Sequence, residues 1–113
     1  MEIFFEEQND TLMILLRGEL DHHNSINMRE QLALKLSEKN YRRIIFNLEG
    51  LDFMDSSGIS FVAHGYKLAS VFDARTYVYT TNQRYQRIFT MANMRELVTI
   101  LSHGKELCKL WKF

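Results

Sequence analysis

The sequence has no proline and a single cysteine, Cys108, which excludes a proline-rich linker and an internal disulfide. Its 5 glycines are scattered and form no glycine-rich phosphate loop, so we expect no nucleotide or other cofactor site. No apolar run approaches the roughly 18 residues that cross a bilayer. The acidic residues 1–7 lack the basic character of a signal peptide, and we therefore expect a cytoplasmic protein without a membrane partner.

The composition is that of an ordinary globular protein: of 113 residues, 46% are hydrophobic and 25% are charged, which predicts one domain over residues 1–113. The formal net charge is 0, yet residues 1–60 carry 11 acidic and 6 basic side chains, and residues 61–113 carry 3 and 8. Such an asymmetry can steer a charged partner, although two halves of a sequence need not form two surfaces. Nothing here is basic enough to indicate a nucleic-acid partner.

The first half of the chain predicts a hairpin, a helix and a buried strand. Two apolar runs flank Asn9-Asp10, a two-residue turn signal, and Met28, Leu32 and Leu36 recur one helical turn apart. Because the apolar strand follows a helix, we expect it to have a parallel partner. The predicted elements are strands over residues 3–8 and 11–17, a helix from a cap at Asn24 or Ser25 to about Lys39, and a strand over residues 44–48.

The second half alternates helices with short strands. We expect a helix to about Phe72, with Ile59, Val62, Ala63, Tyr66 and Ala69 on its buried face. The later elements are a strand over residues 76–80, a helix capped by Asn82 and ended by a left-handed Asn93, a strand over residues 97–101, and a closing helix from Gly104 to Lys112. The fold class is therefore α/β, a mixed sheet of four to five strands with helices packed mainly on one face.

The most informative segment is Asp55-Ser56-Ser57-Gly58, at the expected junction of a strand and a helix. A helix start has unpaired N–H groups and partial positive charge, so a serine there can cap the helix or carry a phosphate. We expect the preceding Phe53-Met54 to anchor the loop to the core, and Gly58 to let another surface approach closely. Both interpretations of the serines, simple capping and modification, remain open on this pattern.

Two catalytic or metal interpretations have little support. The residues around Ser56 are not the Gly-x-Ser-x-Gly elbow of a serine hydrolase, so we expect no enzyme activity. Adjacent His22 and His23 point in different directions on a strand or a helix, and no second pair stands at zinc-binding spacing. We expect a polar surface loop around Asp21, His22 and His23, and no metal.

Two motifs together resemble the STAS domain of anti-sigma factor antagonists, especially those of the sporulation branch. The first is Gly18-Glu19-Leu20-Asp21-His22-His23, and the second is Asn47 to Ile59 with its specific Phe-Met-Asp-Ser-Ser-Gly string. The resemblance covers about residues 3–101 and extends through the helix at Gly65-Tyr66-Lys67.

The resemblance implies a switch protein rather than an enzyme. Such an antagonist binds an anti-sigma factor that is also a serine kinase, which releases a sigma factor; the kinase phosphorylates the first serine, here Ser56, and a serine phosphatase resets it. Asp21 matches the family's acidic residue before the first helix. The implied partner-binding residues are Asp21, His22, His23, Asp55, Ser57, Gly58 and Ile59. A monomer or weak dimer is expected, and the alternative function is a STAS scaffold or accessory subunit of a stress-signalling or transport complex.

Overall fold

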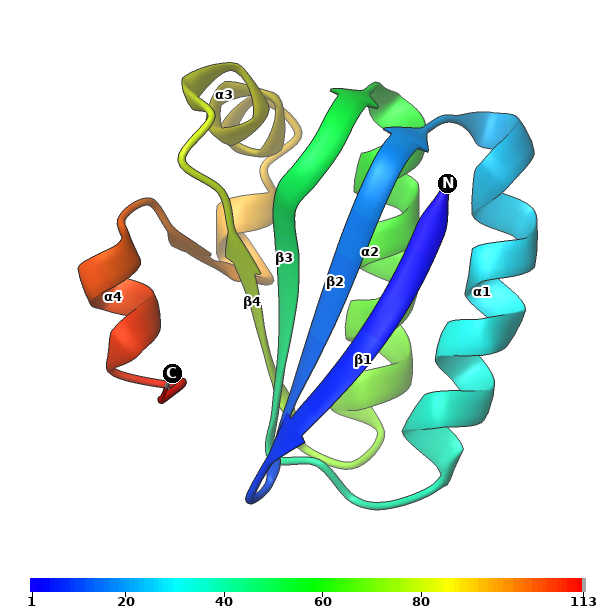
Figure 1. The fold of residues 1–113 in the computed structure, drawn as a ribbon, viewed down its shortest axis with the longest axis vertical. Coiled ribbons are helices and arrows are strands. Elements are labelled where there is room, and N and C mark those ends of the chain that lie inside the picture. Colours follow the sequence, from blue (N-terminus) through cyan, green and yellow to red (C-terminus); the bar gives the residue numbers. More distant parts are fainter. Residues whose placement is uncertain (113) are drawn as a thin grey trace.

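A computed structural model describes residues 1–112 and contains one five-stranded sheet (Figure 1). The strand order is β1-β2-β3-β4-β5; β1 is antiparallel to β2, and the other neighbours are parallel. The elements are β1 (Glu2–Gln8), β2 (Thr11–Leu20), α1 (His22–Ser37), β3 (Arg43–Met54), α2 (Ser56–Ser70), β4 (Arg75–Tyr79), α3 (Gln83–Met91), a 3-10 turn (Met94–Glu96), β5 (Thr99–Leu101) and α4 (Gly104–Cys108).

Helices α1 and α2 lie side by side on one face of the sheet, and α4 lies on the other (Figure 1). The main core fills the space under α1 and α2, where the Phe46 and Phe61 rings meet edge to face with centroids 5.8 Å apart. Gly65 allows this close packing, because a Cβ there would lie 2.5 Å from Cζ of Phe46. A smaller apolar cluster lies under α4 and consists of Met13, Ile45, Leu101, Leu107 and Trp111. The predicted α/β fold with helices mainly on one face is confirmed.

Most predicted elements are present, but several boundaries differ: β2 continues to Leu20 instead of ending near Arg17, and β5 begins at Thr99 instead of Leu97. Strand β3 continues to Met54 instead of ending near Leu48, because its pairing with β2 persists through two register shifts. The buried face of α2 is rotated from the expected one: Gly58, Phe61, Val62, Gly65 and Ala69 are buried, and Ile59, Ala63 and Tyr66 are only partly so. Helix α4 ends at Cys108 rather than Lys112, although Trp111 is still buried.

The sheet has an upper and a lower end, each formed by different elements. The carboxyl ends of β2 and β3 and the first turns of α1 and α2 form what we term the upper end, shown at the top of Figure 1. The lower end comprises the β1–β2 turn, the last turn of α1 and the start of β3. Within residues 1–112, no helix is both long and apolar enough to cross a membrane.

Candidate functional site

Strands β2 and β3 bring two carboxylates to the same edge of the sheet. Leu20 and Met54 are register partners at the ends of these parallel strands, so Asp21 and Asp55 follow at neighbouring positions. Each aspartate immediately precedes a helix, and each has extended backbone geometry. The topology therefore places the starts of α1 and α2 at one end of the molecule.

Both aspartates are helix N-caps. Oδ1 of Asp21 accepts a hydrogen bond from the backbone N–H of Asn24 at 2.9 Å, and Oδ1 of Asp55 accepts from that of Ser57 at 2.8 Å. The expected cap at Asn24 or Ser25 is therefore wrong, because helix α1 begins three residues earlier. Asp21 is half-buried and stabilises the helix start, so it is not a residue of an exposed loop.

Ser56 is the first residue of α2, and its side chain is exposed. Since Asp55 occupies the cap, the interpretation of the serines as simple caps is wrong. Among the described residues the Ser56 hydroxyl has no hydrogen-bond partner of its own, and Ser57 is half-buried. The helix start provides partial positive charge to an anion placed on the Ser56 Oγ atom. The arrangement thus presents a hydroxyl that can accept a phosphoryl group without losing the cap.

Gly58 acts inside the domain rather than at its surface. It is buried, and a Cβ at this position would lie 2.3 Å from Cγ and 2.6 Å from Sδ of Met54. The glycine lets α2 pack directly on the end of β3, which holds Ser56 in place. The expectation that Gly58 lets another surface approach is corrected accordingly, because Met54 already fills that space.

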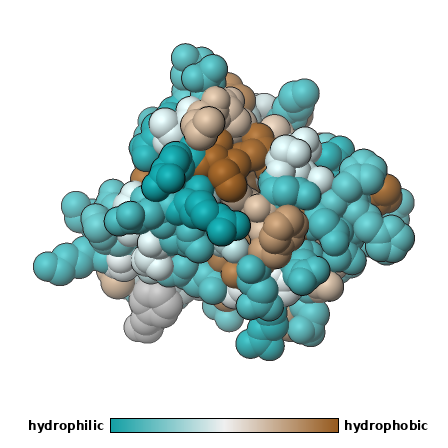
Figure 2. All heavy atoms as spheres, turned by 90° about the horizontal axis from the view of Figure 1, so that it is seen from above, coloured by the Kyte–Doolittle hydropathy of each residue, from teal (hydrophilic) through white to brown (hydrophobic). Residues whose placement is uncertain are grey.

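Phe53 differs from its predicted role. Met54 is 2% exposed and enters the core, whereas Phe53 is 40% exposed, because successive side chains of a strand point to opposite sides. Ile59, one turn into α2, is half-buried. Figure 2 shows the upper end from above, where apolar side chains near the centre are surrounded by polar ones. The exposed Phe53 adds apolar surface beside the serine, which the sequence analysis did not identify.

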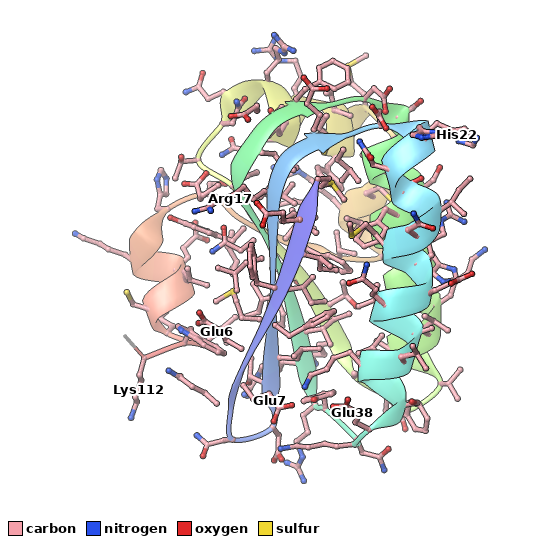
Figure 3. All side chains as sticks on the ribbon, turned by 45° about the vertical axis from the view of Figure 1, so that its right-hand side comes forward. Glu6, Glu7, Arg17, His22, Glu38 and Lys112 are labelled. Atoms are coloured by element: carbon pink, nitrogen blue, oxygen red, sulfur yellow. The ribbon has the colours of Figure 1, made fainter. Side chains whose placement is uncertain are left out.

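The two histidines lie in the first turn of α1, and both are exposed (His22 is labelled in Figure 3). They do not take part in any group of three His, Cys, Asp or Glu side chains within residues 1–112 that could hold a metal ion. His22 contributes its carbonyl oxygen, which accepts a hydrogen bond from the Ser25 hydroxyl at 3.0 Å. The histidine rings themselves are available to solvent at the edge of the site.

Tyr85 of α3 contacts β3 close to the site. Its hydroxyl donates to the carbonyl oxygen of Leu51 in β3 at 3.4 Å, and burial raises the pKa of this phenol. Asn82 caps α3 through hydrogen bonds from the N–H groups of Arg84 and Tyr85, as predicted, and Asn93 adopts the expected left-handed conformation. A hydrogen bond thus connects α3 to the last residues of β3, just before the serine.

A five-stranded mixed sheet with a serine displayed at the start of its second helix is the arrangement of a STAS domain, and the chain belongs to this family, which matches residues 2–106. Within the family it is similar to the anti-sigma F factor antagonist of Paenibacillus polymyxa, at 30% identity over 100 residues, 88% of this chain and 86% of that protein. The family predicted from the sequence is confirmed.

Solved structures agree on the fold. The unphosphorylated anti-sigma factor antagonist SpoIIAA superimposes with a TM-score of 0.78 at 24% identity, over 96% of each chain. The phosphorylated form of SpoIIAA, described as a Bacillus cell fate determinant, gives a TM-score of 0.72 at 23% identity, over 97% of this chain and 100% of that one. The same fold has therefore been solved with and without a phosphate in that protein.

Proposed function

We propose that this protein is an anti-sigma factor antagonist of a sporulation programme. It binds an anti-sigma factor serine kinase, which releases the sigma factor, and it is inactivated when that kinase phosphorylates Ser56. A serine phosphatase restores the active form. The protein acts in the cytoplasm as a monomeric binding module without enzyme activity of its own. The observation that carries the proposal is the exposed Ser56 hydroxyl at the start of α2, next to a cap that does not use it.

Phosphorylation transfers the γ-phosphoryl group of ATP to the Ser56 Oγ atom. The bond between the γ-phosphorus and its bridging oxygen breaks, ADP leaves, and the serine proton passes to a base of the kinase. The chain itself has no phosphate loop, so nucleotide and base belong to the partner. The product carries about −1.5 to −2 charges at neutral pH.

The new charge acts on the interface rather than on the fold. At the start of α2 it meets the favourable end of the helix dipole, so the domain tolerates it. The same charge lies close to the Asp55 and Asp21 carboxylates and occupies the surface that the partner must approach. We therefore assign the partner-binding surface to Asp21, His22, His23, Ser57 and Ile59, extended by the exposed Phe53, with Asp55 and Gly58 positioning the serine.

The proposal is tested by binding of the free and phosphorylated forms to an anti-sigma factor serine kinase. Isothermal titration calorimetry should give an affinity at least tenfold lower for the phosphorylated form, or about 1.4 kcal/mol. Incubation with the kinase and ATP should add one phosphate per chain by intact mass, and Ser57→Ala is the matched control that should still accept it. Equal affinities of the two forms, or binding to a membrane transporter instead of the kinase, would contradict the proposal.

A further inference from the structure

Three basic side chains, Arg29, His64 and Lys67, form no salt bridge among the described residues and lie along the surface where α1 packs beside α2, which we term the α1–α2 groove. On α1, Lys35 points to the flank beside β1, where its Nζ lies 3.0 Å from Glu7. Arg29 lies on the opposite flank of that helix, the one facing α2, as the 100° turn per residue requires. The buried face of α1 between the two flanks consists of Ser25, Met28, Leu32 and Leu36.

Helix α2 completes the groove from the other side. His64 precedes the buried Gly65, which contacts Leu32 of α1, so His64 lies next to the helix–helix contact. Lys67 follows one turn later and is exposed. Burial, followed by the nearby charges of Arg29 and Lys67, holds the pKa of His64 below its usual value.

Nothing in the described part of the chain neutralises these groups. The salt bridges there involve Lys35, Lys39 and Arg42, and none involves Arg29, His64 or Lys67. Helix α2 contains no acidic residue, and the only one in α1 is Glu30, which as an immediate neighbour of Arg29 points away from it. The Nε atom of Arg29 is buried and has no hydrogen-bond acceptor among the described residues. Arg29 as a whole is only partly buried, so a carboxylate from another molecule would pair with the remaining N–H groups of its guanidinium, for which it is the strongest acceptor.

The groove begins at the phosphorylation site. Ser60 and His64 follow Ser56 at intervals of four residues, so one side of α2 leads from the serine to the basic groups. We propose that an acidic segment of the protein partner docks in the α1–α2 groove, its carboxylates pairing with Arg29 and Lys67 beside His64. This inference rests on the proposed function, because the partner is the one controlled by Ser56. A phosphate at Ser56 then repels the carboxylates of the partner at one end of the α1–α2 groove.

A peptide titration tests the groove without the kinase. An acetylated and amidated tetraglutamate peptide is added to isotopically labelled protein at low salt, with tetraglutamine as the neutral control. Only the acidic peptide should shift the Arg29 Nε–H signal and the amides that line the groove, and it should raise the pKa of His64 because a carboxylate stabilises the imidazolium ion. The shifts should shrink at 0.5 M salt and disappear in Arg29→Gln. Lys105→Gln, on α4 across the sheet, is the matched control and should respond like the wild type.

Two results of the titration would overturn the inference. One is a response to tetraglutamate that is absent or unchanged in Arg29→Gln. The other is a groove that responds to inorganic phosphate but not to carboxylates, which would make it a phosphate site.

Binding to a kinase separates this inference from the proposed function. With the anti-sigma F factor of Paenibacillus polymyxa as the probe, the Arg29→Gln/Lys67→Gln double variant should bind at least tenfold more weakly than the wild type at low salt. The Lys105→Gln control should bind normally, and thermal unfolding should verify that all variants are folded. Normal binding by the double variant would overturn the proposal that an acidic segment docks in the α1–α2 groove, while leaving the proposed function intact. If the wild-type protein neither bound this kinase nor accepted phosphate, the proposed function would fail. The peptide titration would still show whether the groove binds carboxylates.

Discussion

The lower end of this domain contains ion pairs, whereas the aspartates of the upper end, Asp21 and Asp55, serve as helix caps. All the salt bridges of the described residues lie at the lower end, where Glu7 contacts Lys35 at 3.0 Å and Lys39 at 4.0 Å and accepts a hydrogen bond from the Tyr41 hydroxyl (Figure 3). At the upper end, Asp21 and Asp55 bind only backbone N–H groups. If the proposed function is right, the ion pairs of one end and the binding surface of the other should respond differently to substitution.

The largest difference is expected for two aromatic residues, one at each end. Tyr41 is 3% exposed, so Tyr41→Ala should lower the free energy of unfolding by about 3–5 kcal/mol. Phe53→Ala, at the upper end, should change it by less than about 0.5 kcal/mol, because the Phe53 side chain packs little against the core. Urea unfolding with linear extrapolation measures both values. Similar losses at the two positions would refute the division between the ends.

The helix caps are the part of the upper end that does contribute to stability. Asp55→Ala should lower the free energy of unfolding by about 0.5–2 kcal/mol, since the N–H of Ser57 loses its acceptor. Asp55→Asn should retain most of the stability, because an asparagine side chain also caps. The alanine and asparagine variants of Asp21 should behave in the same way. Asp21→Asn should leave the melting temperature nearly unchanged but weaken binding of the partner. An equal loss for the alanine and asparagine variants would argue against capping.

The pH dependence of stability should arise at the lower end. Hydrogen bonds from Tyr41 and Lys35 lower the pKa of Glu7 in the folded protein from its ordinary value of 4.5. The stability that ionised Glu7 contributes is complete above the pKa of Glu7 in the unfolded chain. It is lost as the pH falls through the lower pKa of Glu7 in the folded protein. Melting temperature should therefore decrease below about pH 5, and less steeply in Glu7→Gln. A variant as acid-sensitive as the wild type would exclude Glu7 as the cause.

At alkaline pH, the hydrogen bond between Tyr41 and Glu7 is lost because Tyr41 ionises. Burial and the Glu7 hydrogen bond raise the pKa of Tyr41 from 10.0 to about 12 in the folded protein. Its contribution is complete below the unfolded pKa and is lost as the pH rises from about 10 to about 12. Tyr41→Phe should remove this part of the alkaline loss, as measured by thermal unfolding between pH 9 and pH 12. An unchanged alkaline profile would show that another group is responsible.

The smallest effect on stability, with the largest on function, is expected for Ser56→Ala. The serine is exposed and is not the cap, so the free energy of unfolding should change by less than about 0.5 kcal/mol. The variant should bind the kinase but accept no phosphate, and it should therefore act as permanently active. Phosphopeptide mapping of the wild type checks the assignment, and a phosphate found mainly on Ser57 would refute it.

The spacing of apolar residues was sufficient to predict the order of the helices and strands. The buried positions of α1 recur at helical spacing, and the start of β3 is strongly apolar, as expected of a buried strand. The length of β3 could not be predicted, since Glu49, Gly50 and Asp52 interrupt its apolar pattern and only pairing with β2 extends it. The true caps were missed for a related reason. Several capping residues stand in a row at both helix starts, and the chain alone does not show which one has extended geometry.

The site residues stay a prediction, and the structure shows where they lie and corrects the local roles expected for several of them. Ser56 and Asp21 came from the motif, and the structure brings their loops to the same end of the sheet. Gly58 was interpreted as a surface feature because its neighbour Met54 could not be placed against it without the fold. The basic groove joins residues 35 positions apart in the sequence, from two helices, and no local pattern indicates it.

Phosphorylation of Ser56 is expected to act locally, at the upper end, and amide NMR spectra of the free and phosphorylated forms test this directly. We expect chemical-shift changes confined to residues 20–25 and 52–62, since a phosphate at the start of α2 adds charge without disturbing the core or the ion pairs of the lower end. Widespread changes across α3 and α4 would instead indicate a conformational switch, and the local mechanism would have to be abandoned.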